Sequence, residues 1–193
     1  MYKPIIYELG YTLMELMVTI SIAGILLTIA IPNFTSIISS NRLTTYANEL
    51  VTALNFARSE AIRRGQLVMV MRKSATDSEW ERGWDLFLDN DANRVFNDDG
   101  DAILCEVTED CLLRTYDVLP DSYTLRSGSS YACWVVYTVN GLSKGSGPSP
   151  ACNGGFASDT FRLCNGTDKT TSRAITINAV GRIRVSTGTV SCP

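Results

Sequence analysis

Tyr11-Thr12-Leu13-Met14-Glu15-Leu16 begins a long apolar run and places one carboxylate inside it. From Tyr11 to Ile31, Glu15 is the only charged residue. About twenty apolar residues suffice for a helix to span a bilayer core of roughly 30 Å. A carboxylate in hydrocarbon costs roughly 2.5 kcal/mol or more unless it has a partner. We therefore expect a membrane-spanning helix over residues 11–32 in which Glu15 has a function, rather than an ordinary anchor with a tolerated interfacial Glu.

The ten residues before this run are polar and short, and they end at Gly10. Cleavage after Gly10 would remove residues 1–10 and leave the apolar helix in place, whereas a secretory signal is cut after its apolar part. This arrangement resembles the prepilin leader of type IV pilins and type II secretion pseudopilins, with Tyr11 replacing the usual Phe. The resemblance implies cleavage by prepilin peptidase, methylation of the new amino terminus at Tyr11, and a role for Glu15 in assembly.

Two further segments of the sequence point to one group within these pilins and pseudopilins. Residues 57–64 read Ala-Arg-Ser-Glu-Ala-Ile-Arg-Arg, and residues 83–91 read Gly-Trp-Asp-Leu-Phe-Leu-Asp-Asn-Asp. Both are similar to segments of the FimT/FimU (GspH-like) type IV minor pilins. This family implies other major and minor pilins and the inner-membrane assembly platform as partners. It also implies a single-pass inner-membrane protein with a periplasmic C-terminal domain, which becomes part of an extracellular pilus after assembly.

The rest of the chain predicts an α+β fold. Apolar residues recur at spacings of three and four from Leu43 to Ala61, so residues 33–64 should continue the first helix as its amphipathic half. Pro32 should kink this helix, and Gly65 should cap it. β-Branched and aromatic segments predict strands at residues 67–71, 84–88, 112–119, 123–126, 133–139, 160–164, 173–180 and 180–185. The expected architecture is type IV pilin-like, a long N-terminal helix packed on a mostly antiparallel β domain over residues 65–193.

Six cysteines lie beyond the expected anchor, and they are Cys105, Cys111, Cys133, Cys152, Cys164 and Cys192. An even number in an exported domain indicates disulfides. A zinc site is disfavoured because the chain has no His and no Cys-x-x-Cys pair. Sequence alone leaves many pairings open. Our preferred set is Cys105–Cys111 as a local link, Cys133–Cys152 across a Gly/Ser/Pro-rich loop over residues 141–155, and Cys164–Cys192 at the C-terminus.

Charge is distributed unevenly along the chain. Residues 76–121 contain fourteen acidic residues and three arginines, whereas residues 161–193 contain five basic residues and one acidic residue. Asp89, Asp91 and Asn93 alternate as in an EF-hand loop, but Arg94 stands where the turn Gly should be, and Gly100 replaces the bidentate Glu. A solvated acidic loop is therefore preferred to a calcium site, and no metal or cofactor is expected.

The basic C-terminal part contains Gly181-Arg182-Ile183-Arg184-Val185. In a strand, Arg182 and Arg184 would point to one face, while Ile183 and Val185 would pack on the core. The two guanidiniums would then lie some 6.5–7 Å apart, close to the spacing of adjacent phosphates in a DNA strand.

The motif Gly181-Arg182-x-Arg184 is similar to the Gly-Arg-x-Arg of FimT-type minor pilins, where it binds double-stranded DNA for natural transformation. Arg162, Lys169 and Arg173 would widen such a patch. The alternative is that Arg182 and Arg184 form salt bridges with acidic loops or with a neighbouring subunit.

Enzymatic functions are disfavoured by the composition. Without His there is no Ser-His-Asp or Cys-His arrangement, and phosphate-binding Gly-rich motifs are absent from the sequence. The sequence therefore indicates a structural and binding protein. Three roles remain open: a minor pilin that also receives DNA, an assembly-only FimU-like minor pilin, and a GspH-like type II secretion pseudopilin.

Overall fold

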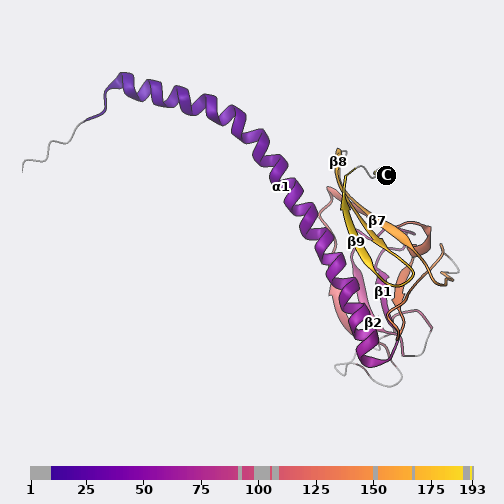
Figure 1. Ribbon diagram of the computed structural model, residues 1–193. Coiled ribbons are helices and arrows are strands. Elements are labelled where there is room, and N and C mark those ends of the chain that lie inside the picture. The colour runs from indigo at the N-terminus through magenta and orange to yellow at the C-terminus, as the bar shows by residue number, and fades with distance from the viewer. Residues whose placement is uncertain are drawn as a thin grey trace, which may run out of the picture. The chain divides into compact units, whose positions relative to one another are not determined.

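The computed structural model describes residues 10–90, 93–97, 105, 109–149, 152–166, 168–188 and 192 (Figure 1). The expected leader therefore lies outside the described residues, apart from Gly10. The side chains of residues 32, 33 and 168–171 are likewise not described. The chain forms two compact units, residues 1–40 and residues 41–193.

The described part of the first unit is the N-terminal half of α1, which extends from Leu13 to Arg64. The Thr12 hydroxyl accepts the backbone N–H of Glu15 at 3.2 Å, so a polar side chain caps the first turn. Apolar side chains are exposed along this half, and the helix is long and apolar enough to cross a membrane. The helix is continuous through Pro32, so the kink expected there stays a prediction.

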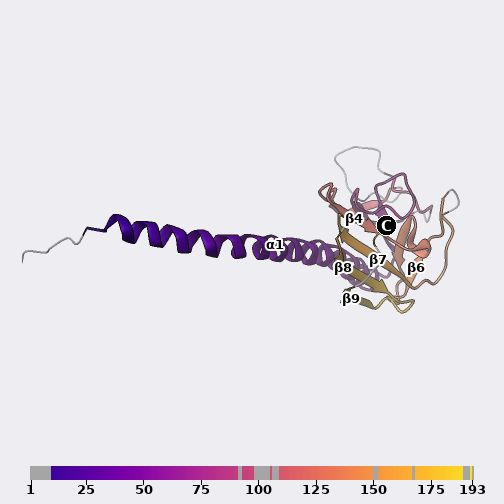
Figure 2. The ribbon, with the colours of Figure 1, turned by 90° about the horizontal axis from the view of Figure 1, so that it is seen from above.

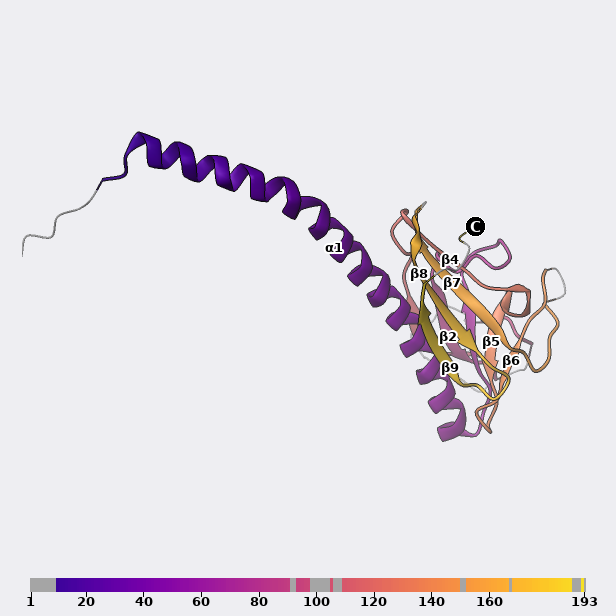
Figure 3. The same ribbon diagram turned by 45° about the horizontal axis from the view of Figure 1, so that its top comes forward.

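In the second unit, the C-terminal half of α1 packs on the β-rich domain (Figure 3). The predicted apolar stripe is confirmed, because the side chains from Leu43 to Ala61 at these spacings are buried. Gly65 has a φ of 67° and donates its N–H to the carbonyl of Ala61 at 3.0 Å, which ends the helix as predicted. In the last turn, hydrogen bonds from Arg63 and Arg64 lower the pKa of Glu60 to about 2.

Two antiparallel sheets follow. The first has the order β3-β2-β1-β5-β6, with β1 at Val68–Arg72, β2 at Trp84–Leu88, β3 at Cys111–Tyr116, β5 at Trp134–Tyr137 and β6 at Ser143–Gly145. The second has the order β4-β7-β8-β9, with β4 at Tyr123–Arg126, β7 at Asp159–Asn165, β8 at Asp168–Ile177 and β9 at Ile183–Thr187 (Figure 2). A short 3₁₀ helix spans Ser129–Tyr131. The predicted α+β class, with a long N-terminal helix packed on antiparallel sheets, is confirmed.

One buried core joins α1 to both sheets. Phe161 of β7 meets Trp80 edge-on, with ring centroids 5.0 Å apart, and stacks on Tyr131 at 5.7 Å. The Trp80 indole donates to the carbonyl of Tyr131 at 3.0 Å, so its buried N–H is satisfied. The second sheet consequently has an inner face turned to the core and an opposite, outer face.

Some strand bounds differ from those predicted. β6 lies within the segment expected to be a loop at residues 141–155, and β8 begins at Asp168 instead of residue 173. β9 begins at Ile183, so residues 180–182 belong to a turn and not to a strand.

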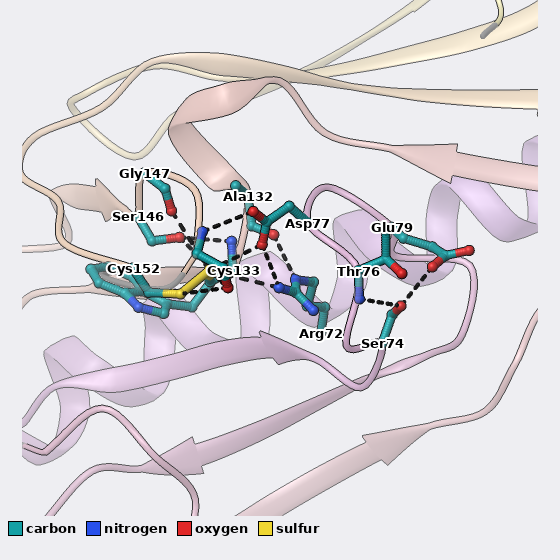
Figure 4. A network of polar contacts seen from close by, with 12 residues as sticks. Arg72, Ser74, Thr76, Asp77, Glu79, Ala132, Cys133, Ser146, Gly147 and Cys152 are labelled. Atoms are coloured by element: carbon teal, nitrogen blue, oxygen red, sulfur yellow. Dashed lines mark hydrogen bonds and ion pairs between the residues drawn. A yellow bond between two sulfur atoms is a disulfide. The ribbon is translucent and has the colours of Figure 1, made fainter.

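The six cysteines, all among the described residues, form the predicted pairs Cys105–Cys111, Cys133–Cys152 and Cys164–Cys192. A polar network surrounds the second of these disulfides (Figure 4). In it, the Arg72 guanidinium donates to the carboxylate of Asp77 at 2.8 Å and to the carbonyl of Ala132 at 2.7 Å. Asp77 also accepts the backbone N–H of Ser149 at 2.8 Å. The loop closed by the Cys133–Cys152 disulfide is therefore also connected to the first sheet through Asp77, which accepts a hydrogen bond from this loop and forms an ion pair with Arg72 of β1.

Candidate nucleic-acid interface

The Gly-Arg-x-Arg motif begins in the turn that joins β8 to β9. Gly181 donates its N–H to the carbonyl of Asn178 at 2.7 Å, and the Asn178 N–H donates to the carbonyl of Arg182 at 3.1 Å. The Asn178 side-chain oxygen accepts the Arg182 N–H at 2.8 Å. With a φ of 74°, Gly181 occupies the left-handed region that favours glycine. The turn therefore has a defined conformation, which places Arg182 directly before the strand.

Both arginines of the motif are exposed. Within the described ranges, neither side chain makes a hydrogen bond or an ion pair with the rest of the chain. Ile183 between them packs against the core, as predicted. Val185, however, is 45% exposed, so the expectation that it packs on the core is wrong. It lies on β9, which among the described residues is an edge strand of the second sheet.

Arg162 shares the outer face of the second sheet with Arg184. Arg184 pairs in register with Thr176 of β8, and the Thr176 hydroxyl is 2.9 Å from that of Thr160 on β7. Arg162 lies two residues further along β7, so it projects to the same face as Thr160. For the part of the chain that is described, the Arg162 side chain also makes no hydrogen bond or ion pair. Its place supports the expectation that it widens the patch.

Arg126 of β4 pairs in register with Arg162, but its charge is locally balanced. Its guanidinium is 2.6 Å from Glu81 and 3.4 Å from Glu79. Burial raises the pKa of Glu81, whereas a hydrogen bond from Ser74 lowers the pKa of Glu79. Arg126 is therefore much less available to an anion than Arg182 or Arg184.

Arg173 does not belong to the patch, and this expectation is corrected. It is buried on the inner face of β8, and its guanidinium donates to the Thr44 hydroxyl of α1 at 3.1 Å. The sequence carries a signal for this, because Arg173, Ile175 and Ile177 alternate along one face of a strand. Arg173 fastens the helix to the sheet. Lys169 lies in β8, but its side chain is outside the described residues.

Arg58 of α1 contacts the motif's turn, and sequence reasoning missed this. Its Nε donates to the carbonyl of Gly141 at 3.0 Å, and its Nη2 donates to the carbonyl of Val180 at 3.2 Å. Both acceptors are backbone atoms, which leave no side-chain pattern in a sequence. The only signal was the place of Arg58 in the segment that resembles the minor pilins.

The remaining predicted site residues belong to other segments of the chain. Gly10 and Tyr11 precede α1, and Glu15 lies in its first turn. In the acidic segment, Asp89 accepts the backbone N–H of Arg94 at 3.2 Å, while Asp91 is outside the described residues. Among the described residues, no group of three or more His, Cys, Asp or Glu side chains could hold a metal ion.

Residues 46–181 match the family described as Type II transport protein GspH, and residues 7–31 match the Prokaryotic N-terminal methylation motif. The chain belongs to the GspH family. Its family confirms the resemblance to minor pilins and pseudopilins inferred from residues 57–64 and 83–91.

Two solved structures share the fold of this GspH-family protein. They are two crystal forms of the type IV minor pilin FimU from Pseudomonas aeruginosa PAO1. The first has a TM-score of 0.53 and 21% identity, and the alignment covers 76% of this chain and 89% of FimU. The second has a TM-score of 0.50 and 22% identity, with coverage of 75% and 92%. At this identity the similarity establishes the fold.

A curated relative is the pilin-like protein PilA1 of Thermus thermophilus. It is 38% identical over 90 residues, which are 46% of this chain and 53% of PilA1. The alignment with this GspH-family chain thus spans about half the length of PilA1.

Proposed function

We propose that this GspH-family protein is a minor type IV pilin that helps begin pilus assembly near the tip and binds double-stranded DNA for uptake in natural transformation. DNA contact is assigned to Gly181, Arg182 and Arg184. One observation carries this assignment: among the described residues, both guanidiniums are exposed and without an acidic partner, although the domain is rich in carboxylates. An arginine pair used for internal salt bridges would contact those carboxylates instead.

The expected mode of binding is contact with the phosphate backbone. Arg184 and Arg162 lie on the outer face of the second sheet, and Arg182 is exposed in the turn before β9. Their positive charge suits sequence-tolerant contact. Few phosphates would be neutralised, so the affinity of one domain should be micromolar or weaker and should fall as salt rises. Several copies in one filament would raise the apparent affinity through avidity.

The DNA proposal is tested with residues 41–193, which form a compact unit with their own core. Arg182→Gln combined with Arg184→Gln should abolish the gel shift of double-stranded DNA, because two phosphate contacts are lost. Circular dichroism and melting temperature should stay near those of the wild type, since both side chains are exposed. A salt titration of the wild-type domain should show weaker binding at higher ionic strength.

The matched control is Arg42→Gln combined with Arg82→Gln, which removes the same charge at two exposed positions outside the second sheet. This variant should retain most of the shift. If the wild-type domain shows no salt-dependent shift at tens of micromolar, DNA binding is rejected and the assembly role stands alone. If both double variants lose binding equally, the effect is one of net charge and not of this face.

For assembly, we propose that prepilin peptidase cuts after Gly10, that the new terminus at Tyr11 is methylated, and that the membrane helix passes through the inner-membrane platform into the pilus. Glu15 would pair with the amino terminus of a neighbouring pilin, since an unmatched charge in the membrane is expensive. The methylation motif over residues 7–31 and the exposed apolar helix support this proposal.

Glu15 also lies at the third position after its cap Thr12, where Glu or Gln favours a helix start. Glu15→Gln keeps this capping ability and removes the charge, whereas Glu15→Ala removes both. We expect both variants to reduce incorporation into sheared pili about tenfold or more, because a missing charge pair costs several kcal/mol in low dielectric. Mass spectrometry of wild-type pili should find chains beginning at Tyr11. Normal incorporation of Glu15→Gln would show that Glu15 acts as a cap and not as a charge partner.

The alternative function is that of an assembly-only minor pilin or a type II secretion pseudopilin. The second of these roles is supported by the description of the matching family, Type II transport protein GspH. A normal level of transformation in a strain that lacks this protein, together with impaired secretion of an exported protein, would decide for the pseudopilin.

A further inference from the structure

Two turns from different sheets meet at Arg58. The first joins β5 to β6, where the Gly141 N–H donates to the carbonyl of Thr138 at 2.8 Å. The second is the β8–β9 turn that begins the Gly-Arg-x-Arg motif. Arg58 donates to Gly141 in the first turn and to Val180 in the second, so one half-buried guanidinium links α1 to both.

The approach between the two turns is very close. A Cβ built on Gly181 would lie 2.1 Å from the carbonyl oxygen of Gly141, the same oxygen that accepts from Arg58. Ser143 of β6 adds a second link, since its N–H donates to the carbonyl of Ala179 at 3.2 Å and its hydroxyl donates to that of Asn178 at 2.7 Å. The turn is therefore held at Asn178, Ala179 and Val180, directly before Gly181.

We propose that Arg58 is a positioning residue for the Gly-Arg-x-Arg motif. Arg58 fixes the β8–β9 turn, so that Arg182 and Arg184 project with a constant separation. The inference rests on the proposed DNA contact and adds to it a residue that acts without touching DNA. A planar guanidinium suits this role because its donors reach two carbonyls in a fixed geometry. A turn held before binding reduces the ordering cost of bringing both arginines onto phosphates.

The first test compares Arg58→Gln with wild type in the 41–193 domain. DNA binding should weaken about tenfold at a temperature well below melting, because the arginines remain but their turn is released. The DNA affinity of Arg58→Lys should lie between those of wild type and Arg58→Gln, because a single ammonium replaces the planar guanidinium and its several donors. Arg82→Gln, an exposed variant with the same loss of charge, should bind DNA about as well as wild type. Unchanged binding by Arg58→Gln would overturn the proposal.

A double-mutant comparison separates positioning from direct contact. The Arg182→Gln, Arg184→Gln variant, which should give no shift under the conditions of the first test, should retain weak electrostatic binding at low salt. If Arg58 acts through the motif, Arg58→Gln in this background should not weaken that remaining binding further. An additive loss would show that Arg58 contacts DNA itself and would overturn the positioning role.

A measurement without DNA separates this inference from the proposed function. In Arg58→Gln, the amide resonances of Gly181 and Arg182 should shift and their hydrogen exchange should accelerate, while those of Leu86 in the first sheet should not change. If these turn amides are unaffected, Arg58 does not fix the turn, whatever the domain binds. If they change but the wild-type domain fails to bind DNA, the proposed ligand is wrong, and Arg58 is rejected as a residue of a DNA site.

Discussion

Gly181→Ala is expected to lower the free energy of unfolding by about 2–4 kcal/mol and to abolish DNA binding. Part of this cost is the left-handed backbone, at a φ of 74°, which is worth about 1–2 kcal/mol for a residue with a Cβ. The remainder comes from the clash, because the new Cβ would lie 2.1 Å from the Gly141 carbonyl oxygen. That oxygen belongs to the backbone and is held by Arg58, so it cannot move as a flexible side chain would.

Gly65→Ala is the matched control for this substitution. Gly65 has a similar φ of 67°, but a Cβ placed there would meet no described atom within 4 Å outside its adjacent residues and the nearby helix backbone. Gly65→Ala should cost about 1–2 kcal/mol, the backbone term alone, and should leave DNA binding unchanged. Chemical denaturation of both variants measures the difference. Equal losses of stability would mean that the close approach of the two turns does not constrain Gly181.

Removal of the Cys164–Cys192 disulfide by paired alanine substitutions should lower the free energy of unfolding by about 3–4 kcal/mol. The bond joins residues 28 apart in sequence and therefore restricts the unfolded chain strongly. It also anchors Cys192 to β7, the strand that carries Arg162. Thermal denaturation without reductant provides the measurement.

The comparison for this prediction is Cys105→Ala with Cys111→Ala, which opens a link between residues only 6 apart. Loop-closure entropy then predicts a smaller loss, about 2 kcal/mol. A larger loss for the short link than for the long one would contradict this explanation. Adding reductant to the wild-type domain should lower its stability below that of either variant.

Much of the fold could be predicted because periodic patterns of apolar residues in the sequence indicate where its helix and several of its strands lie. β2 at Trp84–Leu88 and β4 at Tyr123–Arg126 have the predicted bounds, since each is a short run that contains aromatic and other apolar residues between turn residues. β6 was missed because Ser143–Gly145 is too short for alternation and has the composition of a loop. It exists because it pairs with β5, a tertiary contact that local sequence does not reveal.

The two arginines of the candidate site could be predicted from the sequence, but the residue that contacts their turn could not. The alternation of Arg182, Ile183 and Arg184 indicated two outward guanidiniums, and the structure places both in solvent. The same alternation places Arg173 on the inner face with Ile175, where it is buried, although its positive charge alone favours an exposed position. Arg58 could not be assigned from sequence, since its partners are carbonyls of two turns brought together by folding.

The two faces of the second sheet have different roles, one in the core and one at the surface. Its inner face carries Phe161 and Ile175 in the core and the buried Arg173, which contacts α1, whereas its outer face carries the half-buried Arg162 and the exposed Arg184. Substitutions on the outer face therefore leave the core and the packing of α1 intact. The charge of this surface can be redesigned, one residue at a time, on a scaffold whose stability does not depend on it.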